Sequence, residues 1–409
     1  MRHDAYAALR FPSYRWLFSA HVLMILGFQM QMTALSWLIY EETGSALLLG
    51  LSGLLQFLPV LLLSIPVGHL VDTHSRRKML QVGQFIHFAA CALLAYVSLF
   101  HLPYIPFFIA LLLVGIGSAF GSIARPAMLR DTVPQEAVEN ANKWNSIGRR
   151  IATIVGPIIA GILIAKTHSA LFVFLLNNVC LIFAFINTQQ IPSVARTIQR
   201  TSMTWRSVGE GIRFIRTSPI ILSATLLDMF AVLLGGAEIL LPIFAKDILA
   251  IGPVGLGLLI AGPSIGSLVI TLILAHRGPF RHAGRSLLIS VAMFGICIII
   301  FGISRNAVLS FLLLVASGAF DGISVIIRST ILQLFVPENV RGRVFAVNMI
   351  FVYSSNELGD FESGMAAALL GTVPSVVVGG MAALFVALFF TCRFPQLRNL
   401  GTMSVVTSQ

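Results

Sequence analysis

Residues 46–71 read ALLLGLSGLLQFLPVLLLSIPVGHLV, a stretch of 26 residues without one Asp, Glu, Lys or Arg. The interior of a bilayer offers the backbone no hydrogen-bond partner, so an apolar stretch of about 18 residues or more predicts a helix that crosses the membrane. Similar stretches recur along the chain from residue 16 to residue 392. We therefore expect an all-α membrane protein.

The same criterion predicts about twelve transmembrane helices in two sets of six. The first set covers 16–40, 46–71, 79–101, 104–128, 141–165 and 169–191. The second set covers 219–245, 253–275, 285–304, 307–331, 343–370 and 372–392, of which the long eleventh segment fits the criterion least well. The predicted organisation is an N-terminal half at 1–191, a cytoplasmic linker at 192–218 and a C-terminal half at 219–409.

The linker combines basic and apolar residues. It carries Arg196, Arg200, Arg206, Arg213 and Arg216, with Trp205, Val208, Ile212 and Ile215 at helical spacing. One apolar stripe on a basic helix is typical of a helix that lies at the membrane surface, so an interfacial helix is predicted here.

The composition excludes other classes of protein. Hydrophobic residues make up 57% of the chain and charged residues only 11%, whereas about 25% is usual in soluble domains. The net charge of +11 comes from short clusters between apolar segments, not from an extended basic face, so we expect no nucleic-acid partner. The expected surroundings are a lipid bilayer.

The basic residues also predict the topology. Only Lys166, Lys246 and Arg305 fall near the ends that would face away from the cytoplasm, which leaves the other 24 of 27 on the opposite side. Because cytoplasmic loops are enriched in Lys and Arg, both termini are expected in the cytoplasm, in a multi-pass protein of the cytoplasmic (inner) membrane.

The two halves repeat one another. A shift of 203 residues lays Gly115 on Gly318, Arg125 on Arg328, and Val133-Pro134 on Val336-Pro337. A shift of 204 lays Gly53 on Gly257 and Pro59 on Pro263. Internal repeats close to half the chain length are typical of secondary transporters.

The loop after the second predicted helix identifies a family. It reads Gly68-His69-Leu70-Val71-Asp72-Thr73-His74-Ser75-Arg76-Arg77-Lys78 and resembles the G-x-x-x-D-[RK]-x-[GS]-R-[RK] loop of the major facilitator superfamily, with Thr73 where a basic residue is usual. The resemblance implies a cytoplasmic gate formed by Gly68, Asp72, Arg76, Arg77 and Lys78. A plain cluster of cytoplasmic charges would explain the basic residues but not Gly68 or Asp72.

The fifth predicted helix carries a second motif. Its residues 152–161, ATIVGPIIAG, are similar to the G-x-x-x-G-P-x-x-G-G pattern of exporters in this superfamily, although Ala replaces Gly at two positions. The resemblance implies an antiporter-like kink at Gly156, Pro157 and Gly161. An ordinary packing kink is the alternative.

Four further stretches resemble the drug and siderophore efflux branch, and enterobactin-exporter-like permeases in particular. They are Trp37–Gly44 (WLIYEETG), Arg125–Ala127 (RPA), Gly235–Ala237 (GGA) and Asn356–Gly364 (NELGDFESG).

Six acids lie within the predicted helices, where each charged side chain costs about 2.5–3.5 kcal/mol on insertion scales. They are Asp228, Glu238, Asp321, Glu357, Asp360 and Glu362. We expect these acids to line the substrate cavity and couple proton binding to transport, with Asp228, Asp321 and Glu357 as first choices.

The alternative for any of these acids is an ion pair that only holds helices together. Four arginines near the cytoplasmic ends can supply the partners: Arg125, Arg149, Arg150 and Arg328. The sequence favours such pairs more for Asp360 and Glu362 than for Asp228. Arg125 and Arg328 occupy equivalent positions in the two halves, which favours a role in the fold.

These features predict a secondary transporter that exports an amphiphilic small molecule, a drug-like compound or a siderophore, in exchange for protons. Uptake of a nutrient or metabolite is the alternative, and a membrane-embedded enzyme or lipid scramblase is a second one from another class. The sequence has no G-x-x-x-x-G-K-[ST] loop for ATP and no clustered His/Cys spacing, so neither ATP, a cofactor nor a metal is expected. We expect a monomer.

Overall fold

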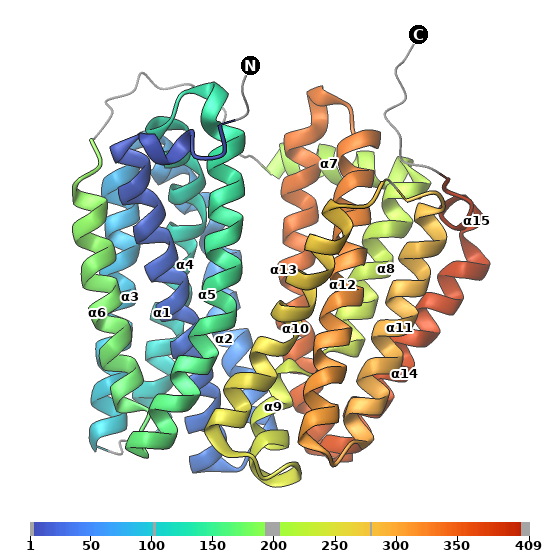
Figure 1. Cartoon of the computed structure of the whole chain (residues 1–409). Helices are drawn as coiled ribbons and strands as arrows, with labels where there is room; N and C mark the ends of the chain where they lie inside the picture. Colours follow the sequence, from blue (N-terminus) through green and yellow to red (C-terminus); the bar gives the residue numbers. More distant parts are fainter. Residues whose placement is uncertain (1–3, 101–103, 193–204, 279, 402–409) are drawn as a thin grey trace. The chain divides into compact units, whose positions relative to one another are not determined.

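The computed structural model describes residues 4–100, 104–192, 205–278 and 280–401, and every regular element within these ranges is a helix (Figure 1). The chain divides into two compact units. Unit 1 comprises Met1–Glu41, Leu54–Met203 and Gly252–Leu258, and unit 2 comprises Glu42–Gly53, Thr204–Ile251 and Leu259–Gln409. The first turns of α2 thus belong to unit 2, and those of α10 to unit 1.

Six long helices supply most of unit 1. They are α1 (Pro12–Thr43), α2 (Ala46–Thr73), α3 (Arg76–Phe100), α4 (Tyr104–Thr132), α5 (Val138–Thr167) and α6 (Leu171–Gln189), with short 3-10 helices η1 (Ala8–Arg10) and η2 (Gln135–Ala137). Within this unit α3 packs against both α4 and α6.

Unit 2 is built from α7 (Trp205–Thr217), α8 (Pro219–Gly235), η3 (Glu238–Leu240), α9 (Leu241–Ile243), η4 (Phe244–Ile248), α10 (Gly252–Ala275), α11 (Ala283–Ile303), α12 (Ala307–Phe335), α13 (Glu338–Leu370), α14 (Thr372–Arg393) and α15 (Pro395–Arg398). Here α11 packs against α12 and α14, and α8 packs against α13 and α14.

Eleven helical segments in the described ranges are long and apolar enough to cross a membrane. The eleventh predicted span, 343–370, is the one not among them; it corresponds to α13, which is 33 residues long but carries several charged residues. This helix is long enough to span a membrane, and it fits the criterion of an apolar stretch least well because of its acids. The all-helical, multi-span fold is confirmed.

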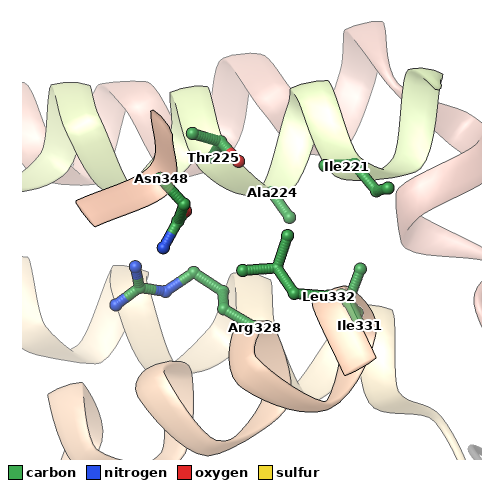
Figure 2. A pocket seen from close by; sticks show the side chains of 7 residues that line it. All are labelled: Ile221, Ala224, Thr225, Arg328, Ile331, Leu332 and Asn348. Carbon is green, nitrogen blue, oxygen red and sulfur yellow. The ribbon is translucent and has the colours of Figure 1, made fainter. Parts of the chain in front are cut away.

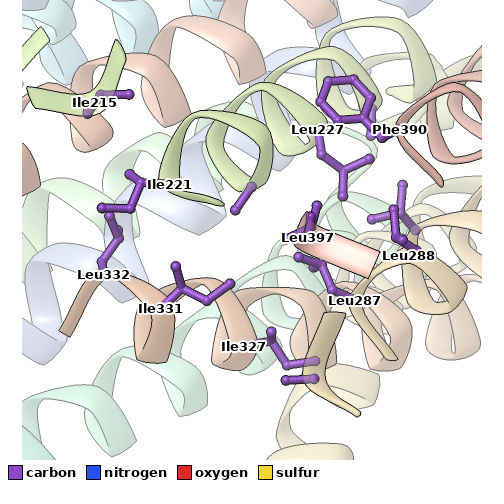
Figure 3. Packing of buried hydrophobic residues seen from close by; sticks show 14 of the residues in the cluster. Ile215, Ile221, Leu227, Leu287, Leu288, Ile327, Ile331, Leu332, Phe390 and Leu397 are labelled. Carbon is purple, nitrogen blue, oxygen red and sulfur yellow. The ribbon is translucent and has the colours of Figure 1, made fainter. Parts of the chain in front are cut away.

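The core of unit 2 is an apolar cluster contributed by seven of its helices (Figure 3). Ile221 and Leu227 of α8, Leu287 of α11, and Ile327 and Ile331 of α12 are each fully buried. Truncating one such side chain to Ala lowers stability by about 2–5 kcal/mol in well-packed cores. The cluster fixes α8 against α12, which sets the position of the charged residues on both helices.

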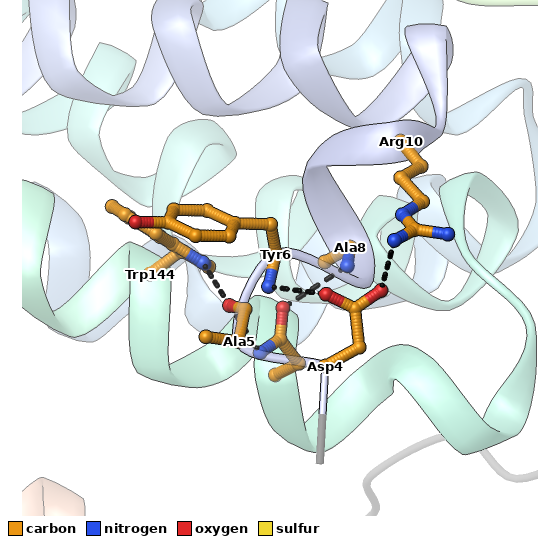
Figure 4. A network of polar contacts seen from close by, with 7 residues as sticks. Asp4, Ala5, Tyr6, Ala8, Arg10 and Trp144 are labelled. Atoms are coloured by element: carbon orange, nitrogen blue, oxygen red, sulfur yellow. Dashed lines mark hydrogen bonds and ion pairs between the residues drawn. The ribbon is translucent and has the colours of Figure 1, made fainter. Parts of the chain in front are cut away.

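The N-terminal segment is fastened to the start of α5 (Figure 4). The backbone N–H of Ala8 donates to Asn140 Oδ1 at 3.0 Å, and the indole N–H of Trp144 donates to the carbonyl of Ala5 at 3.1 Å. The Arg10 guanidinium pairs with Asp4 at 2.8 Å. The start of α1 and the α4–α5 connection therefore lie at the same end of unit 1.

The predicted interfacial helix corresponds to α7. Its Gly211 is buried, and a Cβ there would lie 2.8 Å from Val347 and 2.9 Å from the Arg343 carbonyl of α13. On the opposite side, Arg213 and Arg216 are exposed. One face of α7 is therefore packed on α13 and the other is basic, whereas residues 193–204 of the predicted linker lie outside the described residues.

Candidate functional site

The embedded acids predicted to carry function all lie in unit 2. They are placed on α8 (Asp228), η3 (Glu238), α12 (Asp321) and α13 (Glu357, Asp360, Glu362). Asp228 is buried and Glu238 is exposed, while the other four are half-buried. Because α8 packs against both α12 and α13, the fold brings together acids that are more than 100 residues apart in sequence.

A break in the seventh predicted span positions Glu238. The sequence predicted one helix over 219–245, but α8 ends at Gly235, and Gly236 adopts an extended conformation with φ −64° and ψ 137°. The break frees the Gly236 carbonyl, which accepts a hydrogen bond of 2.8 Å from the Ser363 hydroxyl of α13. Irregular backbone at membrane depth requires such a partner. The prediction of a continuous helix is wrong here because the Gly235-Gly236 pair interrupts it.

Asp228 forms an ion pair with Arg328 of α12. Both side chains are largely buried, with 9% and 13% exposure. The Arg328 Nε also donates to Ser324 at 3.2 Å, which orients the guanidinium along α12. The sequence favoured an ion pair at Asp360 or Glu362 over one at Asp228, and this ranking is wrong. The fixed packing of α8 on α12 brings the two charges together.

Four of the other five acids act on one another and form a group that we call the acidic cluster: Glu238, Asp321, Glu357 and Asp360. The charges of Glu357 and Glu238 act on Asp360, and that of Asp321 acts on Glu238. Within the described part of the chain, no basic side chain lies within 4.0 Å of these four carboxylates. The ion-pair alternative is thus not realised for Asp360, nor for the neighbouring Glu362.

The first turns of α2 lie against the acidic cluster within unit 2. A Cβ built on Gly53 would lie 3.2 Å from Glu357 Oε2 and 3.7 Å from Asp360 Cβ. One turn earlier, Gly50 meets the backbone of Asp360 and Gly364 at 3.0–3.2 Å. Small residues on α2 therefore permit a close helix approach at these acids.

In unit 1 the equivalent arginine has a different partner. The Arg125 Nη1 of α4 lies 2.9 Å from His21 Nδ1 of α1, a hydrogen bond in which the guanidinium donates to the imidazole. Arg149 and Arg150 of α5 are exposed and half-buried, respectively. Of the four predicted arginine partners, Arg328 is the one for which the structure gives an ion pair with an embedded acid.

The predicted gate loop is partly ordered by contacts inside unit 1. The Arg76 Nη1 lies 3.0 Å from Asp131 of α4 and donates to the Ala127 carbonyl at 2.8 Å. The Arg77 guanidinium donates to the Ile191 carbonyl after α6 at 2.9 Å. These bonds join the α2–α3 loop to the ends of α4 and α6. Sequence reasoning missed Asp131, although an acid at the C-terminal end of the fourth helix was visible.

The other three gate residues lie apart from these contacts. A Cβ on Gly68 would meet no described atom within 4 Å. The side chain of Asp72 is exposed. Lys78 is exposed as well. The contacts of this loop therefore depend on Arg76 and Arg77.

The Gly-Pro motif of α5 lies in two close helix contacts of unit 1. A Cβ on Gly156 would lie 2.8 Å from Gln29 Cβ of α1. A Cβ on Gly161 would collide with the Pro253 carbonyl in the first turn of α10. Pro157 lies inside the helix, and its own carbonyl approaches Gly257 of α10. The motif thus brings α5 against α1 and α10 at backbone distance.

Buried amides in unit 1 were not chosen as site residues. Asn177 Nδ2 of α6 donates to Gln31 Oε1 of α1 at 2.7 Å, and Gln84 Nε2 of α3 donates to the Thr188 hydroxyl at 2.9 Å. These bonds connect three helices through their buried faces. Such polar contacts hold helices together in membranes.

The cysteines are free thiols. Cys91, Cys180 and Cys297 are buried, whereas Cys392 is exposed because it lies in the last turn of α14. Among the described residues no group of three His, Cys, Asp or Glu side chains has an arrangement that could hold a metal ion.

Two units of long apolar helices, with the embedded acids in unit 2, define a membrane transporter of the major facilitator fold. The whole chain superimposes on a bacterial homologue of the human lysosomal transporter Spinster with a TM-score of 0.73 at 15% identity, covering 95% of this chain and 98% of that one. The model of the family described as transmembrane secretion effectors matches residues 3–408, and the chain belongs to this family.

Its relatives include exporters. The chain is 24% identical over 371 residues to macrolide efflux protein A of Streptococcus pyogenes, covering 87% of this chain and 89% of that protein. It is 23% identical over 398 residues to the enterobactin exporter of Citrobacter koseri, covering 95% and 93%. The resemblance to the drug and siderophore efflux branch of the major facilitator superfamily is confirmed.

Proposed function

We propose that this transporter exports an amphiphilic small molecule, a drug-like compound or a siderophore, in exchange for protons bound by the acids of unit 2. The observation that carries this proposal is the acidic cluster. Four carboxyl groups share a region of membrane-spanning helices in which no described basic side chain pairs with them.

Such carboxyl groups are stable at membrane depth only if they bind protons or face water. Glu357, Asp360 and Asp321 are half-buried rather than sealed, and Glu238 is exposed. Accessible acids that interact with one another can gain and lose protons as their surroundings change. This supports the acidic cluster as the proton carrier, with Glu357 and Asp360, three residues apart on α13, as its centre.

The direction of transport and the class of substrate are inferred from the relatives. The two that were compared are named for macrolide efflux and for enterobactin export. The Gly156-Pro157 motif of α5 supports export as well, because the resemblance that carries it is to antiporters. We propose both termini in the cytoplasm, a monomer, and a gate in which Arg76 and Arg77 bind loop ends on the cytoplasmic side.

Everted membrane vesicles test this proposal. With an acid interior, wild-type vesicles should accumulate radiolabelled erythromycin or iron-free enterobactin. Collapse of the pH gradient should release the accumulated compound. Glu357→Gln and Asp360→Asn should each abolish gradient-driven accumulation. Glu338→Gln is the matched control, because Glu338 lies on the same helix but is exposed at its end. Full accumulation by both cluster variants would refute proton coupling by these acids.

The sign of the same measurement separates export from uptake. Accumulation in everted vesicles indicates export, whereas accumulation only in right-side-out vesicles would indicate an uptake permease. The relatives give the membrane-enzyme alternative no support, because they are named as a macrolide efflux protein and an enterobactin exporter.

A further inference from the structure

A small pocket lies beside the buried ion pair of unit 2 (Figure 2). The centre of a water-sized sphere can move within a volume of about 10 Å³ in this pocket. This is enough room for about one water molecule. Its wall is formed by Ile221, Ala224, Thr225, Arg328, Ile331, Leu332 and Asn348. These residues come from α8, α12 and α13, all within unit 2, and we call this space the Arg328 pocket.

The internal repeat shows how the residues at the equivalent positions of unit 1 differ from those that line the pocket. The helix starts Pro12 of α1 and Pro219 of α8 are 207 residues apart. The same shift lays Tyr14 on Ile221, Leu17 on Ala224 and Phe18 on Thr225. Unit 1 therefore has a larger side chain at each of three lining positions.

The contacts in unit 1 show how that space is used there. A shift of 203 residues lays Asn145 of α5 on Asn348 of α13. The Tyr14 hydroxyl lies 3.2 Å from Asn145 Oδ1 and donates to the Ala141 carbonyl at 2.8 Å. Phe18 lies beside Tyr14, with ring centroids 6.1 Å apart. The asparagine that meets a tyrosine hydroxyl in unit 1 faces a pocket in unit 2.

Two polar side chains of the Arg328 pocket, Thr225 and Asn348, have hydrogen-bonding capacity that no described side chain uses. Thr225 is 5% exposed, and neither its hydroxyl nor the Asn348 amide has a side-chain hydrogen bond within the described ranges. Arg328 uses Nη1 for Asp228 and Nε for Ser324, which leaves further N–H groups. Figure 2 shows the side chains of Asn348 and Arg328 turned toward each other across the pocket.

We propose that the Arg328 pocket binds one ordered water molecule, and that this water solvates the Arg328 guanidinium so that Asp228 can take up and release a proton while the pair stays buried. A polar cavity with two to four hydrogen-bonding groups and room for one water fits a buried structural water. A buried guanidinium that also donates to a second acceptor loses less stabilisation when its carboxylate becomes neutral. Asp228 is then a second proton site, distinct from the acidic cluster.

The charges balance in this step. A proton from water binds a carboxylate oxygen of Asp228, and the pair changes from net zero to one positive charge, which remains on Arg328. The bound water, Thr225 and Asn348 then supply acceptors for the guanidinium. The charged groups that act on Asp228 are Arg328 and Asp321, both on α12. From α13 the uncharged Asn348 faces the pair, and no charged group of α11 or α14 acts on Asp228 in the described ranges.

Radiolytic footprinting tests the water. Hydroxyl radicals formed from a bound water oxidise the side chains that touch it, even when these are buried. Ile331, which is 0% exposed, lines the pocket, and Ile327, also 0% exposed, lies one turn away on the same helix as the matched control. We expect several-fold more oxidation at Ile331 than at Ile327 in the purified protein. Equal labelling of the two residues would overturn the proposal.

Infrared spectroscopy tests the proton. A pH titration of the wild type should show the band of a protonated carboxyl group that is missing in Asp228→Asn. Thr225→Phe places the unit 1 side chain in the pocket and should abolish both this band and the excess labelling of Ile331, whereas Thr225→Ser should keep both. Asn348→Leu is a second filling variant if Thr225→Phe fails to fold.

Two results contradict the role of the water: no Asp228 band in the wild type, or an unchanged band in the filled variants. The proposal deepens the proposed function, since it adds a proton site to the export cycle. However, both measurements are made without substrate or gradient. A failure of the vesicle experiment with intact labelling and band would therefore reject export and leave the pocket's role standing.

Discussion

The two units carry an arginine at the same position of the repeat, but the two arginines make different contacts. Arg125 and Arg328 are 203 residues apart, and their partners His21 and Asp228 each lie nine residues after the proline that starts α1 or α8. In unit 1 the partner is an imidazole at 2.9 Å, and in unit 2 it is a carboxylate. The repeat thus retains the position of the interaction and changes its charge.

A second comparison gives the same result. The shift of 203 lays Gly156-Pro157 of α5 on Gly359-Asp360 of α13, and Gly161 on Gly364. Gly161 meets the first turn of α10 and Gly364 meets the first turn of α2, so the packing role is shared. The proline in unit 1 is replaced by an acid in unit 2. The comparison teaches that the two units share their packing positions but differ in charge, and in the proposed function unit 2 is the part that binds protons.

The largest expected effect comes from removing the charged partner in unit 2. Asp228→Ala leaves Arg328 buried without its carboxylate and should cost about 3–5 kcal/mol of stability. His21→Ala removes a hydrogen bond to a neutral ring and should cost about 1–2 kcal/mol. Unfolding in mixed micelles measures both. The double variant Asp228→Ala, Arg328→Met should regain part of the loss, and equal losses in the two single variants would break the comparison.

The shared glycine contacts should give the next largest effect. A side chain on Gly364 would collide with the backbone of Ala46 and Gly50, as one on Gly161 would with Pro253. Gly364→Val and Gly161→Val should each lower stability by about 2–3 kcal/mol because of overpacking. Gly342→Ala is the control on α13, since a Cβ there meets no described atom within 4 Å. A tolerated Gly161→Val would show that the two contacts are not equivalent.

The gate loop sharpens the comparison further. Arg76 pairs with Asp131, whereas the shift of 203 lays the exposed Leu334 on Asp131 in unit 2. Arg76→Gln and Asp131→Asn should each cost about 1.5 kcal/mol, as expected for a hydrogen-bonded charge. The double variant should cost little more than either single one, because the residues share one interaction. Additive losses in thermal unfolding would argue against the pair.

The smallest effect is expected at the surface of unit 2. Arg343 of α13 and Glu210 of α7 form a pair that is 46% and 43% exposed. Exposed ion pairs contribute about 0.2–1 kcal/mol. Arg343→Ala should therefore change the midpoint of thermal unfolding only slightly. A loss comparable to that of Asp228→Ala would mean that α7 contributes more to unit 2 than its packing indicates.

Hydrophobic length was enough to predict most of the fold. The apolar stretches of α2, α10 and α11 have no alternative to spanning helices, so their bounds were predicted to within a few residues. The break after Gly235 was not predicted, because a Gly-Gly pair is also tolerated inside membrane helices. Its partner Ser363 lies 127 residues further on, and only the packing of α13 on α8 brings it near.

The sequence made the embedded acids visible, but it did not predict their ion pairs. An acid at membrane depth is visible in sequence, which is why Asp321, Glu357 and Asp360 could be named. Whether an acid meets an arginine depends on the rotation and depth of the helices. The sequence does not give these, which is why Asp228 was ranked wrongly. The Arg328 pocket could not be predicted either, since it results from smaller residues at positions where unit 1 has Tyr14, Leu17 and Phe18.

The central claim, that the acids of unit 2 exchange protons for substrate, can be measured directly. Erythromycin is added to the purified transporter in weakly buffered micelles, and released protons are followed with a pH-sensitive dye. We predict proton release by the wild type and by Glu338→Gln, and none by Asp360→Asn with Glu357→Gln. Binding of erythromycin without proton release, or the same release by the double variant, would contradict the account.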